Sequence, residues 1–123
     1  MKKIFLDANF FIDLIEGRSP IDIYQFKNQA LFISPLTVHI YFYVYKIKIA
    51  NQKFFSFLDF FNIVDLNETI LKNALEGPTN DLEDNIHLHS ASFSGCDLFL
   101  TTDKRLLKMR FFGEMKIENK IKS

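Results

Sequence analysis

The segment Ile4-Phe5-Leu6-Asp7-Ala8-Asn9 decides the fold, because a short apolar run ends abruptly in an acid and a helix start signal. Short apolar runs without polar alternation are typical of strands buried on both faces, as in parallel sheets. Behind this run, apolar residues recur at helical spacing, at Phe10, Phe11, Leu14 and Ile15. Asn9 is the expected N-cap of that helix, and Gly17 is its expected stop. The segment therefore predicts a buried strand that leads into an amphipathic helix.

The same alternation continues along the chain. Further short apolar runs predict strands at 31–33, 63–64 and 98–100, and a last edge strand at 115–117. Helical patterns fill the intervals at 35–50, 54–61, 67–77 and 80–95, the last opened by Asn80 and Glu83 as a capping box. The 38–45 stretch alternates like a strand, but Ser34-Pro35 is a helix start signal and favours a helix. Strands that alternate with helices predict an α/β domain with a mainly parallel sheet covered on both sides, a three-layer α/β/α architecture.

Composition limits the class of protein. The chain has 123 residues, enough for one domain spanning 1–123, and 48% of them are hydrophobic, which excludes a disordered chain. Lys+Arg and Asp+Glu number 15 each, so no overall basic field exists to hold nucleic acid by phosphate contacts alone. Cys96 is the only cysteine, which excludes an internal disulfide. No apolar run reaches membrane-spanning length and no signal peptide is recognised, so the expected compartment is the cytoplasm.

Three acidic residues are expected at the carboxyl end of the predicted sheet. Asp7 comes directly after the first strand and Asp103 shortly after the 98–100 strand, while Asp84 lies near the start of the helix that feeds that strand. Ligands gather at the carboxyl ends of strands in an open parallel sheet. Clustered carboxylates repel one another unless a hard cation such as Mg²⁺ or Mn²⁺ binds between them. The spacing therefore predicts a divalent-metal site formed by Asp7, Asp84 and Asp103.

Each acid also has an ordinary explanation. Asp7 can start its helix and Asp103 can be an N-cap, while Asp81 and Glu83 suit the first turn of a helix. Asp84 lies deeper in its helix and is harder to explain as a cap. Asp97 precedes its strand and is expected at the opposite end of the sheet. His87 and His89 lie two apart on a helix, so they cannot chelate together and are expected on the surface.

These motifs together resemble the PIN-domain nucleases. The stretch Ile4 to Ile12 resembles the family's first strand with its metal-binding Asp and the following Asn, and Ile33 to Thr37 resembles the second motif. The third and fourth acid motifs are resembled by Asp81-Leu-Glu-Asp84 and by Gly95 to Asp103. In small members the resemblance implies Mg²⁺- or Mn²⁺-dependent cleavage of RNA. Many of these are toxins of VapBC-type toxin–antitoxin pairs, which implies a homodimer and a neutralising antitoxin protein as partner.

The resemblance also assigns supporting residues and shows one departure. Thr101 resembles the motif threonine, whose hydroxyl could orient Asp103 or a water; Asn9 is expected to shape the pocket and Asp81 to lie at its mouth. The family commonly has a Glu three residues after Thr37, where this chain has Ile40, preceded by His39. Since isoleucine cannot bind a metal, a catalytically impaired PIN-like domain that binds RNA or protein is the alternative. A phospho-acceptor domain using Asp65 is a second one, which fits the order of the acids less well.

The aromatic segment 54–61 carries more apolar surface than a small domain easily hides. It is interpreted either as ordinary core or, in part, as a dimer face or an antitoxin groove.

Overall fold

The computed structural model describes residues 1–121 as an α/β fold built on a six-stranded sheet. Its strands are β1 (Lys3–Leu6), β2 (Ala30–Ile33), β3 (Asn62–Ile63), β4 (Leu98–Leu100), β5 (Phe111–Phe112) and β6 (Met115–Glu118). Its α-helices are α1 (Ala8–Ile15), α2 (Pro35–Tyr45), α3 (Gln52–Phe57), α4 (Glu68–Glu76), α5 (Leu82–Phe93) and α6 (Lys104–Met109). Two short 3₁₀ helices are η1 (Ile23–Phe26) and η2 (Leu58–Phe60). All five predicted strands and the predicted helices are present, most of them with shifted ends.

The sheet has the strand order β3-β2-β1-β4-β6-β5. All neighbouring pairs are parallel except β5 and β6, which form an antiparallel pair. The prediction that 115–117 is an edge strand was wrong, because β5 lies outside β6 and forms that edge. Gly113 turns between β5 and β6 with a φ of 63°, a conformation that favours glycine. Since β1 and β4 are neighbours, the residues that follow them meet at one end of the sheet.

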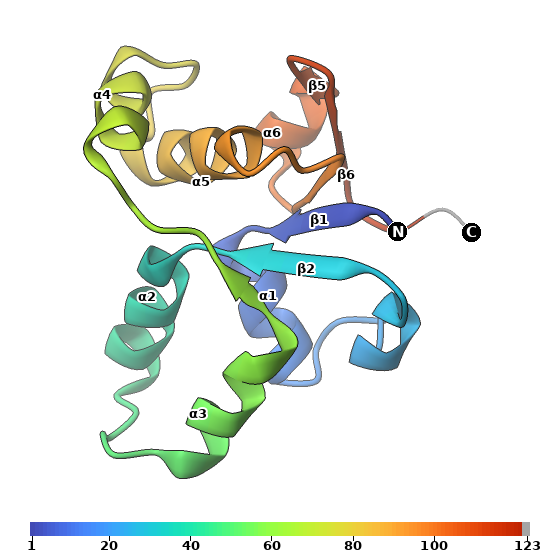
Figure 1. Cartoon of the computed structure of the whole chain (residues 1–123), viewed down its shortest axis with the longest axis vertical. Coiled ribbons are helices and arrows are strands. Elements are labelled where there is room, and N and C mark those ends of the chain that lie inside the picture. Colours follow the sequence, from blue (N-terminus) through green and yellow to red (C-terminus); the bar gives the residue numbers. More distant parts are fainter. Residues whose placement is uncertain (122–123) are drawn as a thin grey trace.

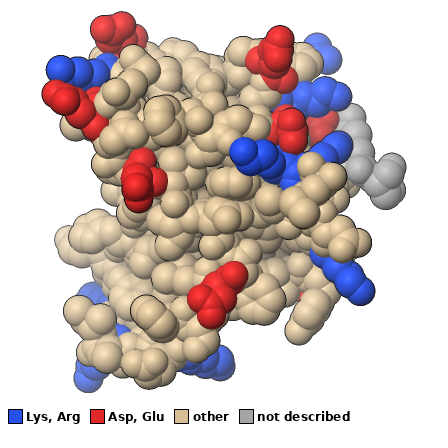
Figure 2. Space-filling view, viewed as in Figure 1, with Lys and Arg blue, Asp and Glu red and all other residues tan. Residues whose placement is uncertain are grey.

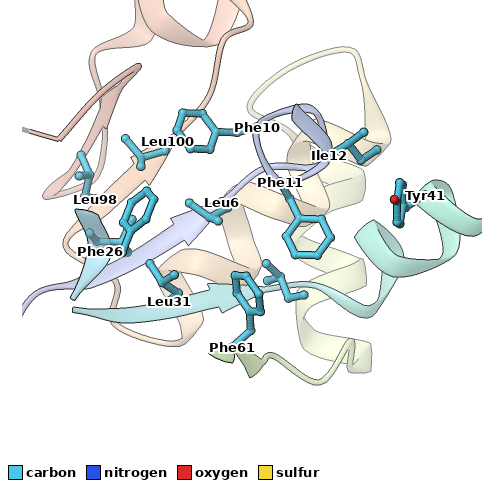
Figure 3. Close-up of a cluster of buried hydrophobic side chains, with 12 residues drawn as sticks. Leu6, Phe10, Phe11, Ile12, Phe26, Leu31, Tyr41, Phe61, Leu98 and Leu100 are labelled. Carbon is cyan, nitrogen blue, oxygen red and sulfur yellow. The ribbon is translucent and has the colours of Figure 1, made fainter. Parts of the chain in front are cut away.

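Helices cover both faces of the sheet, which gives the predicted three layers (Figure 1). On one face, α1, α2 and α3 pack over the side chains that β1, β2 and β4 direct to that side, among them Leu6, Leu31 and Leu98 (Figure 3). On the other face, α4, α5 and α6 pack over Phe5 of β1 and Phe99 of β4, whose rings stack with centroids 5.5 Å apart. Strands that are buried on both faces explain why Ile4-Phe5-Leu6 shows no polar alternation.

Side chains at the helix starts correct two predicted caps. Asp7, rather than Asn9, caps α1, because its Oδ1 accepts a hydrogen bond from the Phe10 backbone N–H at 2.9 Å. Asp81, rather than Asn80, caps α5 through the Asp84 N–H, also at 2.9 Å. A side-chain oxygen at the N-cap satisfies an amide within the first turn, and in both cases the acid stands at the required position.

The helix that follows Ser34 forms as the start signal predicts. Ser34 Oγ accepts from the Leu36 N–H at 3.1 Å, and Pro35 opens α2. The helix ends at Tyr45 instead of Ala50, because Lys46 takes a left-handed conformation with a φ of 52°. The strand-like alternation of this stretch is therefore a composition effect and does not decide its structure.

The aromatic segment 54–61 divides between core and surface. Phe54 and Phe57 pack against the core next to Phe11, whereas Phe55 and Phe60 are 69% and 59% exposed. Among residues 1–121 no helix is long and apolar enough to cross a bilayer.

Candidate functional site

The acidic residues of the predicted site lie around one end of the sheet. Asp7 directly follows β1, and Asp103 lies three residues after the end of β4. These two strands are paired in parallel from Ile4–Leu98 to Leu6–Leu100. Asp84 lies in the first turn of α5, in the layer that covers this part of the sheet. The charges of Asp7 and Asp103 both act on Asp84, so the carboxyl groups share one electrostatic environment.

Asp7 is the most deeply buried of these acids, with 4% of its surface exposed. Its Oδ1 accepts from the Phe10 N–H, and its Oδ2 accepts a short hydrogen bond from the Thr101 hydroxyl. Burial raises the pKa of Asp7, while the hydrogen bonds from Thr101 and from the Phe10 N–H oppose that rise. Asp7 is thus fixed in orientation by two donors, in a position where ionisation is costly without a cation nearby.

Thr101 connects two of the acids. Its hydroxyl donates to Asp7 Oδ2 and accepts from the Asp103 backbone N–H at 3.0 Å, and its side chain is fully buried. The resemblance assigned the threonine to orienting Asp103 or a water. In the structure the Thr101 hydroxyl donates to Asp7, and it contacts Asp103 through the backbone N–H of that residue.

Asp84 is a second acid whose pKa is raised. Its side chain is half-buried, and within residues 1–121 no hydrogen bond to its carboxylate is present. Burial raises its pKa to about 6, helped by the negative charges of Asp81, Asp103, Glu83 and Asp7 in that order. A carboxylate with free oxygens and several negative neighbours is suited to a cation.

Asp103 is held mainly by its own helix. Its Oδ1 accepts from the N–H groups of Arg105 at 2.8 Å and Leu106 at 3.4 Å, so Asp103 is the N-cap of α6. Its Oδ2 lies 3.7 Å from Nη2 of Arg105. The capping explanation for this residue is therefore correct, and it leaves lone pairs on both oxygens for a further ligand.

The donor chemistry of these residues fits Mg²⁺ or Mn²⁺, because every candidate ligand is a carboxylate oxygen and Asp84 has both oxygens free. In the described part of the chain, however, no three His, Cys, Asp or Glu side chains stand close enough together to hold one ion. The ligand set therefore stays a prediction.

The other residues singled out in the sequence lie in different parts of the structure. Asp81 caps α5 from an exposed position at a cleft that Asp84 also lines, and Asn9 is exposed on α1. Asp97 lies at the opposite end of the sheet, as predicted, where its Oδ2 accepts from the Lys3 N–H at 2.9 Å.

Ile40, which stands where the family commonly has a glutamate, packs against the hydrophobic core. Ile40 packs against the apolar cluster between α1, α2 and the sheet, while the preceding His39 is exposed and stacks on Tyr43 at 6.2 Å.

His87 lies inside the protein, and its predicted surface position was wrong. It is 1% exposed, its ring lies 5.8 Å from that of Phe5, and its Nε2 is 3.7 Å from Glu83 Oε2. Neither ring nitrogen makes a hydrogen bond within the described residues. A signal was available, because His87 lies four residues before the small Ala91, and both lie on the buried face of α5.

Comparisons with known proteins agree with this geometry. The model of the PIN domain family matches residues 4–112. Sixteen solved chains match significantly, among them VapBC2 from Rickettsia felis, solved bound to a DNA fragment from its promoter. That match has a TM-score of 0.68 and 17% identity, and it covers 94% of this chain and 97% of the other. At this identity the likeness concerns the fold alone. No curated protein gives a significant match.

Proposed function

We propose, from the premise that the chain belongs to the PIN domain family, that it is a metal-dependent endoribonuclease that hydrolyses RNA phosphodiester bonds. The observation that carries the proposal is the placement of Asp7 and Asp103 after the paired strands β1 and β4, in the electrostatic environment of the half-buried Asp84. Its pKa is about 6 because burial and four nearby acids, Asp7 and Asp103 among them, disfavour its charge. A divalent cation removes this penalty, and catalytic sites are where such perturbed groups collect.

The residues that would hold the ion are Asp7, Asp84 and Asp103, and each has a distinct local role. Asp7 is pre-oriented by Thr101 and the Phe10 N–H, so its carboxylate plane is fixed before any ligand binds. Asp84 has both oxygens free to accept. A bound Mg²⁺ or Mn²⁺ supplies charge neutralisation at the phosphate and an activated water. The Thr101 hydroxyl, which bonds both Asp7 and the Asp103 N–H, holds Asp7 next to the start of α6.

A toxin–antitoxin role is the finer part of the proposal. One of the solved structures with this fold is that of VapBC2 from Rickettsia felis, which supports the same assignment here. An antitoxin and a second copy of the chain are then the expected partners. The exposed Phe55 and Phe60 near the large cleft between α1, α2 and α3 offer apolar surface for either of them.

The test is cleavage of a mixed RNA pool by the purified protein in Mg²⁺ or Mn²⁺. We expect cutting that disappears in EDTA and in Asp7→Asn, which keeps the shape of the side chain and removes its charge. Asp97→Asn is the matched control, because it makes the same change at the other end of the sheet and should cut normally.

Absence of cutting by the folded, partner-free protein under either metal would contradict hydrolysis. It would favour the alternative function, an impaired PIN domain that binds RNA or protein. The observation behind that alternative is Ile40, which fills core where the family commonly has a glutamate.

A further inference from the structure

A cleft of about 360 Å³ opens beside the acids, between the loop 77–81 that joins α4 to α5 and the helix α6. Asp84 lines it, which places the cleft next to the proposed reaction centre. Its other walls combine apolar, amide and charged groups, namely Pro78, Asn80, Asp81, Arg105 and Met109. Small-molecule sites have this combination of apolar walls and a few polar groups, at volumes of about 300 Å³ and above.

The loop wall of this cleft is fixed from below by α5. Asn85, which is 3% exposed, donates from Nδ2 to the carbonyls of Ala74 and Thr79, both at 2.9 Å. Its Oδ1 accepts from the Thr79 N–H at 2.9 Å and the Thr79 hydroxyl at 2.7 Å. His89 Nε2 lies within hydrogen-bonding distance, 2.9 Å, of the Gly77 carbonyl. The wall is therefore pre-organised, which lowers the entropy lost when a ligand binds.

Arg105 is the one basic residue among those described that line the cleft. Its side chain is 78% exposed, and its partner is Asp103 at 3.7 Å, a distance too long for a strong hydrogen bond. The guanidinium therefore keeps donors available, in the planar arrangement that matches two phosphate oxygens. The acids Asp81 and Asp84 in the same cleft repel an anion, so a phosphate is restricted to the Arg105 side.

The uncharged part of the cleft is suited to a nucleobase. Pro78 and Met109 provide apolar surface, and the exposed side-chain amide of Asn80 can both donate and accept. Base edges present donors and acceptors of the same kind, and proteins read RNA mainly through unpaired bases.

We propose that this cleft binds one unpaired nucleotide of the RNA, with its phosphate on Arg105 and its base against Pro78 and Met109, within reach of Asn80. The inference rests on the proposed function for its substrate class. It adds the place where the strand lies and the residues that recognise it.

The experiment measures binding of a fluorescent, unstructured eight-nucleotide RNA by anisotropy, in Mg²⁺ and in an Asp7→Asn background that prevents cutting. Arg105→Ala should weaken binding about tenfold, the effect of losing a charge-assisted hydrogen bond. The slope of log K against log salt should fall by about 0.7, as expected for one phosphate contact on a single strand. Lys72→Ala removes an equal charge from an exposed position on α4 outside the cleft and should leave both values unchanged.

A second arm tests the base. In a series of RNAs with one abasic position each, one position should weaken binding to the parent protein, and that effect should be smaller in Asn80→Ala, which keeps the apolar contacts of Pro78 and Met109. The proposal is overturned if Arg105→Ala binds like the parent, if Lys72→Ala is equally affected, or if no abasic position matters. If the wild type cuts RNA but Arg105→Ala binds RNA as the parent does, the nucleotide cleft is wrong and the hydrolase proposal stands. If Arg105→Ala weakens binding but the wild type does not cut RNA, the hydrolase proposal is wrong and the nucleotide cleft stands.

Discussion

At the scale of the residue, Asp84 couples the candidate site to stability. Its pKa is about 6 in the folded protein against 3.8 for an unperturbed aspartate, mainly because of burial. Between these values the folded state binds more protons than the unfolded state, so the free energy of unfolding falls as the pH rises from about 4 to about 6. Asp84→Asn should therefore stabilise the metal-free protein at pH 7.5, by about 1 kcal/mol after discounting for solvent screening.

Urea unfolding in EDTA at pH 4.5 and pH 7.5 measures this effect. The stabilisation by Asp84→Asn should be present at the higher pH and nearly absent at the lower one. Asp59→Asn, at an exposed acid on η2, is the matched control and should show neither effect. Equal stabilisation at both pH values would mean that the charge of Asp84 is not the cause.

Single residues also show which features of the site can be predicted from the sequence. Asp7 and Asp103 each fit two explanations, helix cap and site residue, and the structure shows the capping bonds of both. Spacing along the chain cannot separate these roles, because the N-cap position and the carboxyl end of a strand coincide at a strand–helix junction. The burial of His87 was not predicted, because a polar side chain on a helix is ordinarily exposed, and only its position on the same helix face as Ala91 indicates otherwise.

At the scale of the element, Asn85 is the side chain that joins α5 to the preceding loop. It satisfies two carbonyls, one N–H and one hydroxyl at once, and all its donors and acceptors are used. Asn85→Ala should lower the free energy of unfolding by about 2–4 kcal/mol, because several polar groups lose their partner. The amide of Thr79 should lose protection against hydrogen exchange more than the amides of β1 do.

Asn73→Ala is the comparison for that loss, since Asn73 is exposed on α4. A similar loss of stability in both variants would show that the Asn85 network contributes nothing special. Elements such as α4 and α5 were predictable from their start signals, but this network was not, because it joins a helix to a loop without any periodic pattern.

At the scale of the whole molecule, the parallel sheet and its two helical layers follow from buried strands such as 4–6 and 98–100, which are apolar on both faces. The β5–β6 hairpin did not follow. β5 has two residues, and a strand that short carries no usable alternation. The position of β6 inside the sheet depends on long-range pairing with β4, which no local signal encodes.

Stability of the whole chain also offers a test of the metal site that does not depend on catalysis. An ion that binds the folded state alone raises the free energy of unfolding by about 2.7 kcal/mol at a concentration 100 times its Kd. For a domain of this size the melting temperature should rise by roughly 10 °C in Mn²⁺ relative to EDTA. Asp7→Asn should abolish most of that rise, because the pre-oriented carboxylate would be lost, whereas Asp97→Asn should keep it. A rise of equal size in all three proteins would place the ion elsewhere, and no rise in the wild type would remove the basis for a metal-dependent nuclease.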